Sequence, residues 1–529
     1  MMKLLTDTNA IEEAAERIDE LLASHSEWFV GAQDESLRTI SLRRNEIDIS
    51  IAQGRLILSY WNEVGALHWR ITGWEWTGAK LLFDAARNLN RTRVRLEIIP
   101  RTQAKTIAAG VSAARRASCE QLAALAAKQA GDAQIEKAGL SAGVRRDEPG
   151  RHALIILSLS RPRRERIAVT GYVMEANAGE VDALLSSALL WFLRVRERAA
   201  RPSVRKLWLI VNQECLAAVQ QRVALLRDDL RDQIAVYEVD HERRTLTAVA
   251  PLKEAKLWPE ARVRVRRPAA IPAAGDTARD IIALAPEAID VVLRARHGET
   301  LRYHGLAFAR VRRVMNREHV WFGTESKRRR LLSDSTAGEW QKLLRELIEH
   351  RRASAPDHRH ALYRAAPEAW LESLLRRDIT RLDPGLIIAP LHREFRVRET
   401  SNAGNDINGN RMNAARPVDL LALRQDGRLV VIELKVNEDR EHVLQGVDYW
   451  HRVEAYRRSG GIERARLFGN AVIADEPPLV YLVAPGLRFH RAFQTLAECI
   501  TTRVEIYRFD LSEDWRAGVR VMRRTRVRK

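Results

Sequence analysis

Two apolar runs separated by a short polar segment stand out in the C-terminal third of the chain. The first run covers residues 418–423 and the second covers residues 429–436, so each is long enough for a β-strand. The segment Gln425-Asp426-Gly427 between them is typical of a hairpin turn, where glycine is favoured because it accepts positive φ. The pattern therefore predicts two adjacent antiparallel strands.

Three charged residues accompany these apolar runs. Glu433 and Lys435 are two residues apart and share a face of the second strand, and pairing can bring Asp419 alongside them. Mg²⁺ and similar cations prefer oxygen ligands, so we expect Asp419 and Glu433 to bind Mg²⁺ (or Mn²⁺), with the Leu434 carbonyl as a further ligand. Lys435 would orient or help deprotonate the attacking water, whose pKa the metal lowers. The predicted reaction is hydrolysis of a phosphodiester bond.

This arrangement resembles the PD-(D/E)xK nuclease superfamily. The D-L-L-A strand from Asp419, the glycine turn and the V-V-x-E-x-K strand ending at Lys435 are most similar to the C-terminal nuclease domain of NucS/EndoMS-type endonucleases, over roughly residues 365–512. By this resemblance, Glu372 is the helix-borne acid of the site. The same resemblance implies that Gln445, which has Tyr449 one helical turn later, supports the site or contacts nucleic acid.

One segment departs from the family pattern. Residues 401–415 are rich in Asn and Gly and lengthen the stretch between the helix acid and Asp419, as either a flap over the substrate or a tolerated insertion. This departure leaves Glu368 and Glu394 open as alternatives to Glu372. A Glu-x-Lys pair alone is also common on solvated sheet faces, so the catalytic interpretation depends on the whole set of residues.

An upstream region repeats the apolar pattern without the charges. Residues 153–159 and 167–173 flank a basic turn at residues 161–166, and later strands are expected at residues 206–211 and 234–240. Where the C-terminal copy has Glu433-Leu434-Lys435, this region has Thr170-Gly171-Tyr172. We therefore expect a degenerate, metal-free copy used for nucleic-acid binding or self-association; the alternative is that any strand-helix-strand sequence looks similar.

The fold class predicted for the whole chain is α/β and multidomain. It combines a C-terminal restriction-endonuclease-like αβββαβ core, the degenerate copy upstream, and a small N-terminal β-rich domain whose tryptophans are expected in the core. The region between the copies includes an Ala/Pro linker at residues 268–272 and a block from His304 to Arg310 that a packed hairpin explains better than a phosphate contact. The expected domains are residues 1–104 (β-rich), 105–250 (degenerate copy), 251–360 (linker and basic α+β domain) and 361–529 (nuclease domain).

Composition agrees with a polyanionic partner. The chain has 88 Lys+Arg against 69 Asp+Glu, a formal net charge of +19, which attracts DNA but would also suit a ribosome or a membrane surface. The three cysteines, Cys119, Cys215 and Cys499, are expected to be buried hydrophobes. Without an apolar stretch near the ~20 residues of a spanning helix, we expect a cytoplasmic protein with no membrane partner.

Two functions follow from these features. The first is a metal-dependent endonuclease that hydrolyses DNA, in repair or in defence. The second is a non-catalytic nucleic-acid-binding protein that uses a nuclease fold as a scaffold, because a fold alone does not fix a function. NucS-like proteins act as dimers, which leaves a homodimer open; their mismatched or branched substrates are not carried over, because the N-terminal half does not clearly match theirs.

Overall fold

The computed structural model describes most of the chain, which forms two compact units. The first is chiefly residues 1–114 and the second begins at Arg115, so the division falls within helix α2 (Ala104–Gln129). The described residues are 3–5, 7–32, 40–62, 65–87, 92–100, 104–143, 149–159, 165–173, 176–198, 204–241, 243–252, 257–258, 274–294, 298–314, 317–324, 329–388 and 419–528. The predicted linker at residues 268–272, the insertion at residues 401–415 and Glu394 lie outside them.

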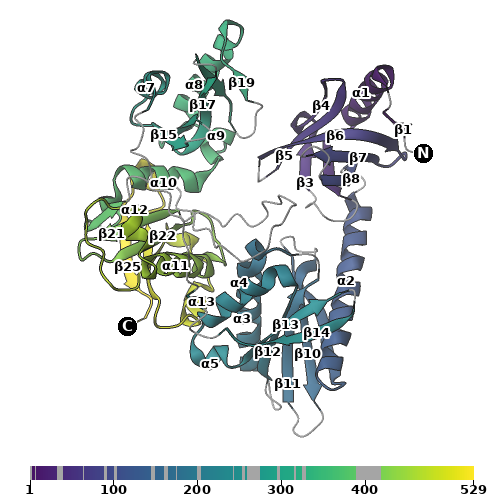
Figure 1. Cartoon of the computed structure of the whole chain (residues 1–529), viewed down its shortest axis with the longest axis vertical. Coiled ribbons are helices and arrows are strands. Elements are labelled where there is room, and N and C mark those ends of the chain that lie inside the picture. Colours follow the sequence, from purple (N-terminus) through teal and green to yellow (C-terminus); the bar gives the residue numbers. More distant parts are fainter. Residues whose placement is uncertain are drawn as a thin grey trace. The chain divides into compact units, whose positions relative to one another are not determined.

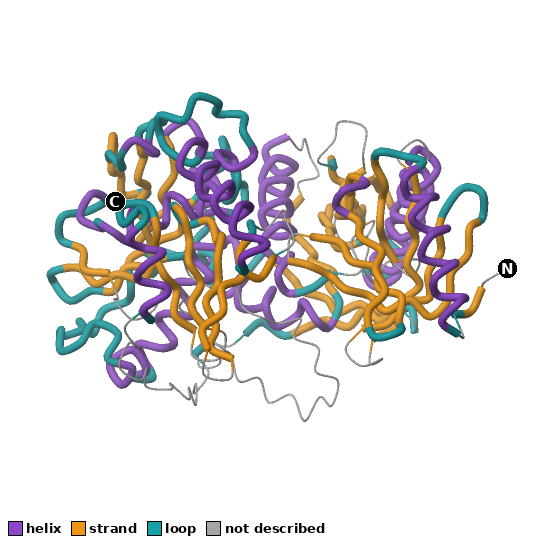
Figure 2. The backbone as a smooth tube through the Cα atoms, turned by 90° about the horizontal axis from the view of Figure 1, so that it is seen from above, coloured by secondary structure: helices purple, strands orange, loops and turns teal. Residues whose placement is uncertain are grey.

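The first unit is built on an antiparallel sheet in the order β3-β2-β8-β7-β6-β5-β4, with β1 paired to β6 (Figure 2, strands in orange near the N label). Helix α1 (Thr8–Ala23) packs on it through an apolar stripe that includes Ile18 and Leu22. Trp28 and Trp69 are fully buried, which confirms that these tryptophans belong to the core. The strands are β1 (Lys3–Leu4), β2 (Glu27–Ala32), β3 (Ile40–Arg43), β4 (Ile47–Ala52), β5 (Arg55–Asn62), β6 (Gly65–Trp76), β7 (Leu81–Arg87) and β8 (Thr92–Pro100).

The second unit begins with a mixed sheet in the order β14-β13-β12-β11-β10-β9. Helix α2 covers one face, and α3 (Val181–Arg198) and α4 (Gln213–Ala224) cover the other, as Figure 1 shows. The short helix α5 (Asp228–Arg231) precedes β13. The strands are β9 (Gln134–Ala142), β10 (Pro149–Leu159), β11 (Glu165–Tyr172), β12 (Val204–Val211), β13 (Ile234–Asp240) and β14 (Thr245–Val249).

An antiparallel sheet, β15-β16-β17-β18-β19, follows in the chain. Its turn at His304-Gly305 packs on helix α10 (Pro367–Arg377), because a Cβ built on Gly305 (φ +80°) would lie 1.9 Å from the Ala369 carbonyl oxygen. The packed hairpin is thus confirmed. The elements are α7 (Asp276–Ala283), β15 (Ile289–Arg294), β16 (Gly298–Tyr303), β17 (Leu306–Val314), β18 (Arg317–Phe322), β19 (Arg330–Leu331), α8 (Ala337–His350) and α9 (Ala361–Arg364).

Arg351 ties this region to the helix that follows. Its guanidinium is fully buried, lies 4.8 Å from the Trp370 ring, and donates hydrogen bonds to five backbone carbonyls. The acceptors are the carbonyl oxygens of Tyr303, His304, Leu362, Ala365 and Ala366. A buried charge needs such compensation, so Arg351 holds the β16–β17 turn against the start of α10 (Pro367–Arg377).

The last sheet has the order β20-β21-β22-β23-β24-β25. The predicted hairpin is confirmed: Leu420 pairs with Ile432 in antiparallel register, and Gly427 has φ +83° in the turn. Helix α10 packs on one face, and α11 (His442–Arg458) packs on the other. The remaining elements are β20 (Leu386–Ile388), β21 (Leu420–Arg424), β22 (Leu429–Leu434), α12 (Gly461–Ala465), β23 (Leu479–Pro485), α13 (Phe493–Glu498), β24 (Glu505–Leu511) and β25 (Val521–Arg526).

The two mixed sheets share one plan. In each, a helix precedes three antiparallel strands, a helix leads to a parallel strand, another helix leads to a second parallel strand, and an antiparallel strand ends the sheet (Figure 1). In each, the preceding helix covers one face and the later helices cover the other. The chain is therefore an α/β protein with several sheets, and the four-domain division stays a prediction.

Two further sequence expectations concern cysteines and membranes. Cys119, Cys215 and Cys499 are buried and free, as predicted. Among the helices that the structure describes, none is both long enough and apolar enough to cross a membrane.

Candidate active site

The hairpin brings the predicted acids to one end of the last sheet. Glu433 is the next-to-last residue of β22, Lys435 follows the strand, and Asp419 directly precedes β21. Because Leu420 pairs with Ile432, the neighbouring residues Asp419 and Glu433 meet at the same end of the two strands. Asp419 Oδ2 accepts a hydrogen bond from the Leu434 backbone N–H at 2.8 Å, which fixes the carboxylate over β22.

Lys435 is held by two acids. Its Nζ lies 2.9 Å from Glu433 Oε1 and 3.4 Å from Asp439 Oδ2. Glu433 is 2% exposed, and its second oxygen, Oε2, is buried. In the described part of the chain no N–H or O–H group donates to Oε2, and the Asp419 carboxyl beside it can share a proton with the Glu433 side chain. Leaving a buried carboxylate oxygen unsatisfied costs free energy, so such an atom calls for an explanation. A cation bound at Oε2 would supply one.

The electrostatics of the site disfavour the ionisation of both carboxyl groups at once. Burial raises the pKa of Glu433 well above its ordinary value, and the negative charge of Asp419 adds to the effect. Burial likewise raises the pKa of Asp419 to about 6, against the Leu434 N–H and Lys435, which lower it. Burial alone would lower the pKa of Lys435, but the surrounding acids, Glu433 first and then Glu368 and Asp439, together raise it and keep the ammonium protonated. Without a cation, the two acids therefore tend to retain a proton.

The helix-borne acid predicted from the resemblance, Glu372, is linked to Asp419 through an arginine. Its Oε1 is 2.5 Å from Arg376 Nε, and its Oε2 is 3.8 Å from Arg302 Nη1. Arg376 Nη2 in turn donates to the Asp419 carbonyl oxygen at 2.9 Å, so Glu372 reaches Asp419 through Arg376. Glu368, one turn earlier and exposed, raises the pKa of both Asp419 and Lys435. Both helix acids thus lie close enough to act electrostatically on Asp419, and the choice between them stays open.

Gln445 lies in the first turn of α11 and is 4% exposed. Its side-chain amide donates to Glu441 Oε2, at 3.4 Å, and this contact does not link it to Asp419 or Glu433. The predicted supporting role of Gln445 therefore stays a prediction.

Three residues that the sequence pattern did not single out join the site. His442 is buried, and its Nε2 lies 3.2 Å from the Glu433 carbonyl oxygen. Burial and the charge of Lys435 lower the pKa of His442 to about 4, so the ring is neutral near pH 7 and its Nε2–H donates to that carbonyl. Asp439 and Arg376 are the other two, and each lies four residues after the charged residue it contacts. The four-residue spacing could have predicted the contact only for Arg376, because Arg376 and Glu372 lie on the same helix.

The donor set fits a hard divalent cation only in part. Two carboxylates, with a buried oxygen to which no N–H or O–H group of the described residues donates, match the oxygen preference of Mg²⁺, which commonly completes its shell with water and substrate phosphate. In the described part of the chain, however, no group of three or more His, Cys, Asp or Glu side chains is arranged to hold a metal. The protein therefore offers two carboxylates, and the Leu434 carbonyl as a third ligand stays a prediction.

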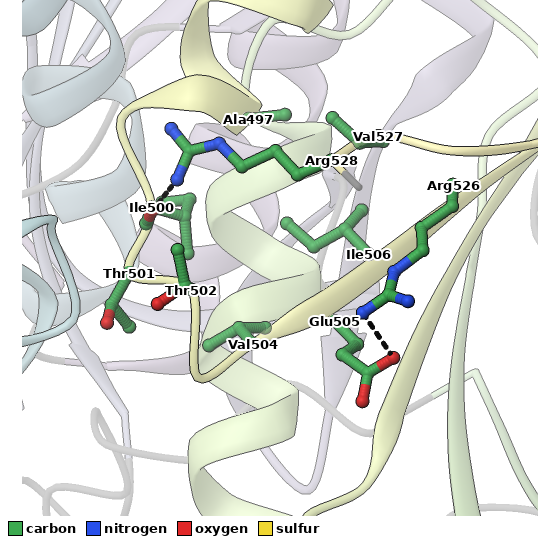
Figure 3. A pocket seen from close by; sticks show the side chains of 10 residues that line it. All are labelled: Ala497, Ile500, Thr501, Thr502, Val504, Glu505, Ile506, Arg526, Val527 and Arg528. Carbon is green, nitrogen blue, oxygen red and sulfur yellow. Dashed lines mark hydrogen bonds and ion pairs between the residues drawn. The ribbon is translucent and has the colours of Figure 1, made fainter.

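A small recess lies elsewhere, beside β24 and β25 (Figure 3). Two arginines border it: Arg526 pairs with Glu505 at 3.0 Å, and Arg528 donates to the Ile500 carbonyl oxygen at 2.8 Å. None of the candidate site residues lines it. The recess therefore does not help to locate the chemistry.

No protein-family model matches the chain, and no curated protein matches it either. One solved structure, described as "Structure of EndoMS in apo form", aligns with 9% identity over 45% of this chain and 97% of that chain, at a TM-score of 0.15. At this score the alignment carries no argument about fold or function. The assignment of the candidate site therefore rests on the geometry of its residues.

Proposed function

We propose that the protein is a metal-dependent endonuclease that hydrolyses DNA phosphodiester bonds, in repair or in defence, with its active site at Asp419, Glu433 and Lys435. The observation that carries this proposal is Glu433 Oε2, a buried carboxylate oxygen to which no N–H or O–H group of the described residues donates, beside a second acid and a lysine. The order of α10, β20–β22, α11 and β23 supports a restriction-endonuclease-like αβββαβ core. The net charge of +19 supports DNA as the partner.

Each residue has a distinct role in this proposal. Asp419 and Glu433 would hold Mg²⁺ or Mn²⁺, which when bound lowers the pKa of a water and polarises the phosphate. Lys435, kept protonated by Glu433, would orient the attacking water and offset the charge that builds on the phosphate. His442 holds the end of β22 through the Glu433 carbonyl, and Arg376 holds the backbone of Asp419.

The competing function is a non-catalytic nucleic-acid-binding scaffold. That function does not require buried acids to face each other, because a binding surface gains nothing from two carboxylates that repel phosphate. Here Asp419 is fixed against β22 and Glu433 is 2% exposed, so the charge arrangement costs stability without aiding DNA binding. This cost favours the catalytic proposal over the scaffold.

The test is cleavage by the full-length protein. Labelled single-stranded, duplex, mismatched and branched DNA are incubated with Mg²⁺, with Mn²⁺ or with a chelator. We expect cleavage of at least one substrate with metal, loss of cleavage in the Glu433→Ala, Lys435→Ala double variant, and retention in Glu438→Ala, which removes an exposed acid from the same loop. Binding without cleavage by any of these proteins would contradict the proposal and favour the scaffold.

A further inference from the structure

The two mixed sheets of the second unit contact each other through equivalent elements. Helix α3 occupies the place in the first sheet that α11 occupies in the second, and α4 corresponds to α13. Helix α3 contacts both α11 and α13, and side chains of all four helices share one apolar core. From α4, Arg222 Nη1 reaches Asp448 of α11 at 2.7 Å. The α3–α13 and α4–α11 contacts are therefore counterparts of each other.

The segments that follow α4 and α13 also pair with each other. Leu226 and Ile500 form an isolated antiparallel β-bridge. The Arg227 N–H donates to the Cys499 carbonyl oxygen at 2.9 Å, and the Thr501 N–H donates to the Leu225 carbonyl oxygen at 2.9 Å. Reciprocal contacts between equivalent segments are what a twofold axis produces in a symmetric dimer. Here the axis relates two halves of a single chain.

A buried ion pair network reinforces this contact. Arg222 is 6% exposed and lies 3.1 Å from Asp182 of α3 as well as 2.7 Å from Asp448, which Arg452 also contacts at 2.5 Å. Removing one partner of a buried ion pair is strongly destabilising, and here Arg222 of the first half is shared between Asp182 of its own half and Asp448 of the second half. The contact is a built interface that occupies the α11 and α13 surface of the C-terminal half.

The first half has no acids where the second has its candidate site. The last register pairs are Leu434–Val483 in one sheet and Gly171–Ile210 in the other. Aligning them places Leu154 at the position of Asp419, Thr170 at that of Glu433 and Tyr172 at that of Lys435, and Leu154 does pair with Thr170. Thr170 is fully buried. These apolar or neutral side chains offer no carboxylate to a divalent cation.

We propose that this chain works as a monomer whose two halves form an internal counterpart of a symmetric nuclease dimer, with one cutting centre, so that each binding event cuts one strand of a DNA duplex. The inference rests on the proposed endonuclease function. Each strand of a duplex needs a centre directed at its own phosphates, and only the C-terminal half carries Asp419 and Glu433. The helix surface that a second copy would need is covered by α3 and α4.

A disulfide across the internal axis tests the pairing. Leu226 and Ile500 are flanked on both sides by interstrand hydrogen bonds, a geometry with a Cα–Cα distance of about 4.5 Å, within the span of a disulfide. In a Cys499→Ala background, Leu226→Cys with Ile500→Cys should oxidise within one chain and keep the sedimentation mass of a 60.3 kDa monomer. The single Leu226→Cys variant is the control. A cross-linked species of twice this mass, or no cross-link, would overturn the internal pairing.

Strand counting tests the consequence. Wild-type and cross-linked full-length proteins are given supercoiled plasmid and a mismatched duplex with a different dye on each strand, with Mg²⁺ or Mn²⁺. We expect open-circular plasmid to accumulate before any linear form, and duplexes that stay intact on native gels but carry one cut strand on denaturing gels. Linear plasmid as the first product would overturn the one-strand proposal. If no DNA is cut, the proposed function and the strand claim both fail, while the cross-link still decides the pairing.

Discussion

The β9–β14 half and the β20–β25 half have the same strand order and the same helix placement, yet they fill one position differently. At the ends of the central strands, the first half has Leu154 opposite Thr170 and the second has Asp419 beside Glu433. The first arrangement costs little free energy, because it buries no charge. The second arrangement lowers stability at neutral pH, because burial and mutual repulsion raise the pKa of both acids. Because the same fold forms in the first half without buried acids, the acids of the second half are better explained by a catalytic role than by a structural one.

The largest difference between the halves should appear in DNA cleavage. Lys435→Ala should slow cleavage by about 10²–10⁴-fold, because it removes the group proposed to orient the water. Thr170→Val, at the equivalent end of the first half, should leave the rate within about twofold, since none of the described residues hydrogen-bonds its buried hydroxyl. Single-turnover cleavage under saturating metal measures both. Equal losses in the two variants would remove the distinction between the halves.

The contact between the halves should account for a large share of stability. Arg222→Ala leaves Asp182 and Asp448 without their shared cation and should lower the free energy of unfolding by about 3–5 kcal/mol. The matched control is Arg243→Ala, which removes an 84% exposed arginine 3.6 Å from Asp240 and should change it by less than about 1 kcal/mol. Urea unfolding gives both values. A small effect at Arg222 would show that this ion-pair network does not stabilise the contact.

A smaller effect is a gain of stability on removing an acid. The pKa of Asp419 rises from 3.8 to about 6 on folding, so its stabilising contribution is present below pH 3.8 and is lost as pH rises through about 6. At pH 8 without metal, Asp419→Asn, whose amide oxygen can still accept from the Leu434 N–H, should therefore raise the free energy of unfolding by about 1–2 kcal/mol, and the gain should shrink at pH 5. Thermal unfolding at both pH values, with Thr170→Val as the neutral control, measures this. Destabilisation at pH 8 would contradict the raised pKa values.

The smallest expected effect concerns metal affinity. Because a bound cation must displace protons from the Asp419–Glu433 pair, Mn²⁺ affinity should rise about tenfold or more between pH 5.5 and pH 7.5. Titration calorimetry in buffers of different ionisation enthalpy also counts the protons released. Glu433→Gln should flatten the dependence. An affinity that is flat in the wild type would mean that the cation binds elsewhere.

The sequence predicted the local part of this site and not its surroundings. The two apolar runs and the turn at Gly427 were sufficient for the hairpin, and so for the meeting of Asp419 with Glu433. His442 was missed because its contact runs to a backbone carbonyl, which leaves no mark on a side-chain pattern. The Arg222–Asp448 pair was missed because its partners are far apart in sequence, and such contacts follow from tertiary packing alone. Nucleic-acid binding or self-association was expected of the upstream copy. The structure pairs that region with the C-terminal half of the same chain, and nucleic-acid binding stays a prediction.

The buried guanidinium of Arg351 bears on how this chain can be divided for study. A fragment that began at residue 361 would keep the carbonyls of Leu362, Ala365 and Ala366 but lose the donor that all three share. These carbonyls lead into α10, which carries Glu368 and Glu372. Excising the C-terminal half at that point would loosen the entry to the helix beside the candidate site. An inactive fragment of this kind would report on where the chain was cut and say little about its chemistry.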